Sequence, residues 1–91
     1  MFSFGSKQIQ AGESHTISNV PAGTALGVNP GPGGTVRVQY RISPKGQLFD
    51  WPSGPVTSQM SDVTGSPSFE IVFTALDADG FAEWNSPRRR I

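Results

Sequence analysis

Glycine and proline recur so often along this chain that they leave little room for a helix. The 91 residues include 11 glycines and 8 prolines, about a fifth of the total. No window carries an amphipathic helical period that is free of both residues for two helical turns. Because both residues weaken helices and favour turns, the sequence predicts short strands joined by turns.

Two segments show the alternation of a half-buried strand, with apolar and polar side chains on opposite faces. In residues 35–42 the shared apolar face consists of Val36, Val38, Tyr40 and Ile42. In residues 68–75 it consists of Phe69, Ile71, Phe73 and Ala75. We expect both segments to be central strands. If they pair, Glu70 would face Arg37 or Arg41 across the solvated side.

Weaker strands surround these two at a spacing of about ten residues, which is typical of a small sandwich or barrel. The expected weaker strands cover residues 7–11, 15–20, 24–28, 48–51, 56–60 and 81–84. Gly12-Glu13 and the segment 77–80 are interpreted as hairpin turns. The sequence therefore predicts an all-β fold, a small antiparallel β-sandwich or barrel of about seven to eight short strands. We expect one domain over residues 1–91, with an N-terminal segment 1–6 and a basic C-terminal tail 87–91.

The charges balance over the whole chain but are unevenly placed. Seven Lys and Arg stand against seven Asp and Glu, and three of the basic residues are Arg88, Arg89 and Arg90. Residues 1–87 therefore hold four basic and seven acidic groups, a net charge of −3. Nucleic-acid binding requires a spread basic surface, so this balance disfavours it, and three arginines fall short of an independent site.

The chain has no cysteine, which excludes a disulfide framework, a thiolate nucleophile and a cysteine-based zinc site. The first residues carry no basic segment followed by an apolar run, so we expect no signal peptide. No stretch approaches the ~20 apolar residues of a membrane span. We therefore expect synthesis and first folding in a cytoplasm.

Catalytic and metal-binding patterns are weak. His15 is the only histidine, and no nucleophile motif accompanies it, so a structural or solvent-facing role is favoured. Asp77, Asp79 and Gly80 resemble the start of a calcium loop, but Ser86 stands where the bidentate Glu is needed. The Gly-rich segment 31–34 lacks the Lys and helix of a phosphate loop. We expect no enzyme, no cofactor and no metal site.

Aromatic side chains and the arginine run carry the strongest signal of a protein interface, because Trp, Tyr, Phe and Arg are enriched at interface centres. The candidate protein-interface residues are Phe2, Phe4, Trp51, Trp84, Arg88, Arg89 and Arg90. Each has a plainer alternative. The phenylalanines would complete an edge of their own sandwich, the tryptophans would be partly buried in the core, and the arginines would form a solvated tail.

The middle of the chain is similar to small all-β virion proteins of tailed bacteriophages. The similarity is carried by the Gly-x-Val-x-Val-x-Tyr strand from Gly34 to Tyr40, the Trp-Pro-Ser-Gly turn from Trp51 and the strand from Phe69 to Thr74. It covers roughly Gly33 to Ala75. The resemblance implies capsid decoration or another small virion component, present in many copies and without enzymatic activity.

Taken together, these features predict a decoration or cement protein that stabilises a phage head by bridging capsid subunits. The implied partners are the major capsid protein or other virion proteins, with self-association into a homotrimer favoured and no specific nucleic acid or membrane. The implied location is the capsid surface of the virion, after assembly in the host cytoplasm. The alternatives are a tail, neck or head-fibre component, or a carbohydrate- or surface-binding module in which Trp51 or Trp84 presents its ring to a sugar.

Overall fold

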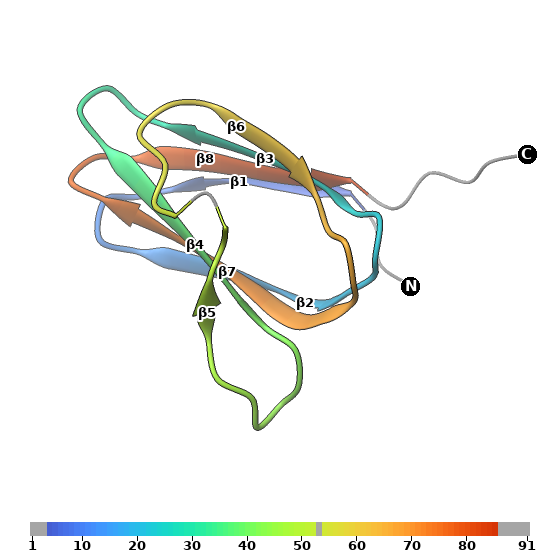
Figure 1. Cartoon of the computed structure of the whole chain (residues 1–91). Coiled ribbons are helices and arrows are strands. Elements are labelled where there is room, and N and C mark those ends of the chain that lie inside the picture. Colours follow the sequence, from blue (N-terminus) through green and yellow to red (C-terminus); the bar gives the residue numbers. More distant parts are fainter. Residues whose placement is uncertain (1–3, 53, 86–91) are drawn as a thin grey trace, which may run out of the picture.

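A computed structural model describes residues 4–52 and 54–85, and it confirms the predicted all-β fold as a β-sandwich. The strands are β1 (Gly5–Ile9), β2 (Ser14–Val20), β3 (Ala25–Pro30), β4 (Thr35–Arg41), β5 (Phe49–Asp50), β6 (Met60–Val63), β7 (Ser68–Leu76) and β8 (Gly80–Asn85). They form two antiparallel sheets that pack as two layers (Figure 1). Sheet 1 has the order β1-β8-β3-β6 and sheet 2 has the order β2-β7-β4-β5.

Between these strands, six of the seven connections cross from one sheet to the other. Only β4 and β5 form a hairpin, closed by a turn in which the Gly46 amide donates to the Ser43 carbonyl at 2.9 Å. The predicted hairpins at Gly12-Glu13 and at 77–80 are wrong. Each of these turns is an arch between the sheets, because β1 and β8 pair with each other while β2 and β7 pair in the opposite layer.

The core lies between the two layers and centres on β4 and β7. Val36, Val38, Ile71 and Phe73 are fully buried there, as the alternation predicts. Burying a side chain of this size stabilises the fold by about 1.5–3 kcal/mol. The full cluster is Ile9, Ile17, Val20, Leu26, Val28, Val36, Val38, Trp51, Val56, Ile71, Phe73, Ala75 and Ala82.

The predicted inward faces fail at two strand ends. Ile42 is 52% exposed because β4 ends at Arg41, one residue earlier. Phe69 is only half-buried, while its neighbour Ser68 is buried. Opposite this end of β7, Asn19 has a φ of +54° in β2, and such a left-handed residue disturbs the regular alternation of a strand.

The fifth and sixth strands also differ from the expected ranges. The expected strand over 56–60 is replaced by a single bridge, in which Val56 and Val36 exchange both backbone hydrogen bonds at 2.9 and 3.0 Å. Pro55 has no N–H to continue such a ladder, and regular pairing resumes at Met60 in sheet 1.

The expected contact across β4 and β7 is present, with Arg41 as the partner of Glu70.

Two arches meet at one end of the sandwich, where the β3–β4 loop packs on the β7–β8 turn. The Gly31 amide donates to the Asp79 carbonyl at 2.8 Å. A Cβ on Gly31 would stand 2.3 Å from that carbonyl oxygen, so only glycine fits. The side chain of Asp79 adds a bond to the β1–β2 turn, accepting from the Ala11 amide at 2.9 Å. The glycine-rich segment therefore serves loop packing.

Candidate interaction surface

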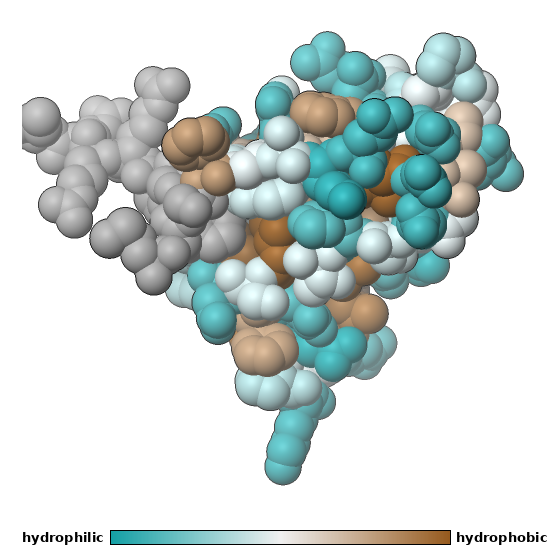
Figure 2. All heavy atoms as spheres, turned by 180° about the vertical axis from the view of Figure 1, so that it is seen from behind, coloured by the Kyte–Doolittle hydropathy of each residue, from teal (hydrophilic) through white to brown (hydrophobic). Residues whose placement is uncertain are grey.

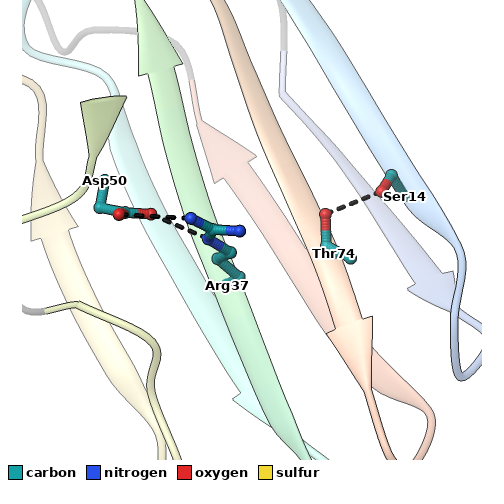
Figure 3. Close-up of polar contacts among 4 residues, drawn as sticks. All are labelled: Ser14, Arg37, Asp50 and Thr74. Atoms are coloured by element: carbon teal, nitrogen blue, oxygen red, sulfur yellow. Dashed lines mark hydrogen bonds and ion pairs between the residues drawn. The ribbon is translucent and has the colours of Figure 1, made fainter. Parts of the chain in front are cut away.

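The outward face of sheet 2 is polar, and its charges are paired within the chain. Figure 3 shows Ser14 and Thr74 joined by a 2.7 Å hydrogen bond, and Arg37 donating to Asp50 at 2.9 and 3.4 Å. The hydrogen bond from Arg37 lowers the pKa of the Asp50 carboxyl, and the same bond raises the pKa of the guanidinium. These contacts join β2 to β7 and β4 to β5, and they match the charges of Arg37 and Asp50 within the chain.

A second ion pair lies on the same face. Arg41 Nε stands 3.1 Å from Glu70 Oε1, without the alignment of a hydrogen bond. Both side chains are about a quarter exposed, at 28% and 21%. The cations of β4 are thus matched by carboxylates of β5 and β7, as expected for a solvated face.

The outward face of sheet 1 is different, because it carries almost no charge. The register of its four strands places these described residues outward: Ser6, Gln8, Ala25, Gly27, Asn29, Ser61, Val63, Phe81, Glu83 and Asn85. Glu83 is the only charged residue among them. Val63 and Phe81 are 55% and 40% exposed on this face.

A shallow trough runs over the middle of this face. Its floor is β3, where Ala25 and Gly27 have little or no side chain, and its walls are β6 and β8. The cavity measures about 400 Å³ and is lined by Ala25, Leu26, Gly27, Ser61, Asp62, Val63, Glu83 and Asn85. Glu83 leans over Gly27, since a Cβ there would meet the Glu83 Cγ and Oε1 at 2.9 Å. Within residues 4–52 and 54–85, the Glu83 carboxylate makes no ion pair or hydrogen bond.

The free edges of the two sheets are poorly suited to adding a further strand. Lys7 on β1, His15 on β2 and Asp62 on β6 each stand opposite a buried core residue, so they belong to the inner face of an edge strand. Inward-pointing charges on edge strands oppose edge-to-edge pairing. The fourth edge, β5, has only two residues. These features favour the sheet faces as contact surfaces.

The structure describes three of the seven predicted interface residues, namely Phe4, Trp51 and Trp84. Phe2, Arg88, Arg89 and Arg90 lie outside the described residues. Phe4 is described, and it precedes β1 with its side chain 76% exposed. An exposed phenylalanine at the start of an edge strand is compatible with the predicted contact role.

Trp51 is a core residue rather than part of an open surface. It is only 8% exposed, and its indole Nε1 donates to Asp62 Oδ2 at 2.8 Å. Its ring also meets Tyr40 edge-on, with centroids 5.7 Å apart. The ring closes the side of the sandwich between β5 and β6, which is the plainer of the two predicted roles. A small pocket of about 210 Å³ beside it is lined by Tyr40, Trp51, Asp62 and Ser68, among others.

Trp84 is half-buried and packs against the core from β8. Its ring stacks on His15 at 5.3 Å and on Phe73 at 6.2 Å. Neither tryptophan thus stands open as a flat platform, so the carbohydrate-binding alternative finds no ready stacking surface at either ring.

Sequence reasoning missed Val63, Phe81 and Glu83. Alternation in the last strand places Phe81 and Glu83 on one face, but which strands flank them depends on the sheet order.

The side chains considered for catalysis or metal binding have structural roles. Burial lowers the pKa of His15, and the nearby Lys7 charge lowers it further. No cluster of three metal-ligating side chains occurs among the described residues. An open cleft of about 830 Å³ lies beside the meeting loops, and Asp79 is the one titratable residue in its described lining.

No helix in the described part of the chain is long and apolar enough to cross a membrane.

The surface drawn in Figure 2 is mostly hydrophilic, with separate apolar patches between polar residues. Single exposed apolar residues of this kind are normal, and a larger contiguous patch would be needed for a strong hydrophobic interface.

The fold and surface together define a small β-sandwich with one charged, self-paired face and one nearly uncharged face. No protein-family model matches the chain, and no curated protein or solved structure shows significant similarity to it.

Proposed function

We propose that this protein is a non-enzymatic structural component of a virion, a decoration protein that attaches to a bacteriophage head and bridges capsid subunits. The observation that carries this proposal is the contrast between the two sheet faces. The charged side chains of β4 in sheet 2 are matched within the chain, whereas sheet 1 presents Val63 and Phe81 around the Glu83 carboxylate, which has no partner among the described residues. The sequence resemblance over residues 33–75 supplies the virion context.

The size of the sheet 1 face explains why many copies would be needed. Four strands spaced about 4.8 Å apart, each four to six residues long, cover roughly 350 Å². A stable pairwise interface buries about 800 Å² per partner, so one face alone supports only weak binding. A protein that bridges neighbouring subunits gains affinity through several linked contacts. Association into a homotrimer on the capsid surface would supply them.

The test is to add the purified chain to phage head shells that lack it and to measure the bound fraction by pelleting. Phe81→Glu places a charge on the sheet 1 face and should reduce the bound fraction at least tenfold. Thr16→Glu adds the same charge on the outward face of sheet 2 and should bind like wild type. Equal binding by all three proteins, or none by the wild type, would sink the proposal.

A further inference from the structure

The Glu83 carboxylate in the sheet 1 trough, which is unpaired within residues 4–52 and 54–85, points to the chemistry of the partner. We infer that the trough binds an extended protein segment that places an arginine guanidinium against Glu83. This inference rests on the proposed use of the sheet 1 face and identifies what would occupy it.

The middle of the sheet 1 face carries a negative charge. Glu83 stands in the middle of an otherwise uncharged outward face and has no cation or hydrogen-bond donor among the described residues. Within residues 4–52 and 54–85 no Lys, Arg or His lines the trough, and the carboxylate of Asp62, which also lines it, accepts from the Trp51 indole. A partner that covered Glu83 with apolar groups alone would strip water from an unpaired carboxylate, which is strongly unfavourable. The covering surface must therefore bring a cation to this position.

The shape of the trough favours an extended chain. Ala25 and Gly27 form a floor along β3, and the side chains of β6 and β8 rise on either side. The trough thus follows the direction of a strand. Successive side chains of an extended segment point alternately toward and away from such a floor, so one residue of the segment can reach down to Glu83 while its neighbours meet the walls.

Arginine fits this position better than lysine. The planar guanidinium pairs with a carboxylate through two parallel hydrogen bonds, is less strongly hydrated than an ammonium, and stacks on aromatic faces. Phe81 lies two residues before Glu83 on the same face, about 7 Å along the strand, where its exposed ring is within reach of the same group. The cations of the chain's own β4 are already paired with Asp50 and Glu70 and are on the opposite sheet.

The test uses the chain alone and is independent of any shell. The chain labelled with ¹⁵N is titrated with the tripeptide amide acetyl-Val-Arg-Val and, separately, with acetyl-Val-Lys-Val. The arginine peptide should shift the amide signals of Gly27, Ser61 and Glu83 in a saturable way, with an affinity about threefold or more above that of the lysine peptide. Glu83→Gln should abolish the shifts.

Glu13→Gln is the matched control, because it removes the same charge from the exposed β1–β2 turn and should leave the titration unchanged. Three results would overturn the inference: equal shifts with both peptides, shifts confined to sheet 2, or shifts that survive Glu83→Gln. Signals of the trough that move on simple dilution of the chain would also overturn it, since the occupant would then be a second copy.

The shell assay separates this inference from the proposed function. If Phe81→Glu lowers shell binding while Glu83→Gln binds like wild type, the sheet 1 face is the contact surface and the arginine assignment is wrong. If arginine-selective modification of the shells with phenylglyoxal weakens binding of wild type but not of Glu83→Gln, the arginine lies on the shell.

Discussion

His15 and Trp84 stack across the two layers of the sandwich, with ring centroids 5.3 Å apart and planes inclined by 20°. His15 comes from β2 in sheet 2, and Trp84 comes from β8 in sheet 1. The stack holds the only histidine of the chain in a site that disfavours its protonation, because the ring is partly buried and because Lys7 on β1 adds a nearby positive charge. The pair thus links the packing of the two sheets to pH.

Stability should fall when the medium becomes mildly acidic. Burial and Lys7 lower the pKa of His15 in the folded state below its ordinary value of 6.5. The unfolded chain therefore binds more protons than the folded chain as pH falls through that value, and the free energy of unfolding decreases. We expect a lower urea midpoint at pH 5 than at pH 7.5.

His15→Phe keeps an aromatic ring against Trp84 and removes the titration, so its urea midpoint should change less between the two pH values. The measurement is urea unfolding followed by circular dichroism. An identical pH dependence in wild type and His15→Phe would show that other groups cause the change.

The hydrogen bond from Trp51 to Asp62 should be important for stability. Asp62→Ala leaves the indole N–H of a buried ring without its acceptor, which costs about 1–3 kcal/mol. Asp62→Asn keeps an acceptor oxygen and should cost less. Chemical unfolding monitored by tryptophan fluorescence gives both values, and equal destabilisation by the two variants would contradict the assigned role of the bond.

The sequence predicted the elements whose own residues settle their structure. In β4 and β7, strict alternation identified the buried faces. Glu70 was expected opposite Arg37 or Arg41 if the two strands pair, and the structure gives Arg41. These are local patterns with a period of two, and packing preserved them. They failed only near strand ends, at Ile42 and Phe69.

The type of each turn and the location of the contact surface were harder to predict from the sequence. Glycine and aspartate favour a tight turn whether the chain returns in the same sheet or crosses to the other, so Gly12 and Asp77–Gly80 did not distinguish hairpins from arches. The trough depends on Gly27 and Glu83 lying side by side on β3 and β8, 56 residues apart in sequence. Only the strand order brings them together, and no local pattern encodes it.

Phe73 and Phe81 provide a matched pair that separates a stability role from a surface role. Phe73 is fully buried, and Phe73→Ala should destabilise the fold by about 3–5 kcal/mol, a large share of the total for a domain of this size. Phe81→Ala should change the free energy of unfolding by only about 0.5 kcal/mol or less, because the ring faces outward. Thermal unfolding by calorimetry measures both. A large loss for Phe81→Ala would mean that its ring supports the fold.

Gly31 lies at the contact between the two arches, so replacing it should destabilise the fold. In Gly31→Ala the new Cβ meets the Asp79 carbonyl at a distance no real contact allows, so the loop must move and its hydrogen bond to Asp79 must weaken. We expect a loss of about 1–3 kcal/mol, as for overpacking elsewhere. Gly65→Ala is the control, because nothing lies within 4 Å of its Cβ position and its φ is not in the left-handed region. That variant should be neutral or stabilise by about 0.4–1 kcal/mol through the unfolded state. Urea midpoints that are the same for Gly31→Ala and Gly65→Ala would contradict a close packing of the two loops.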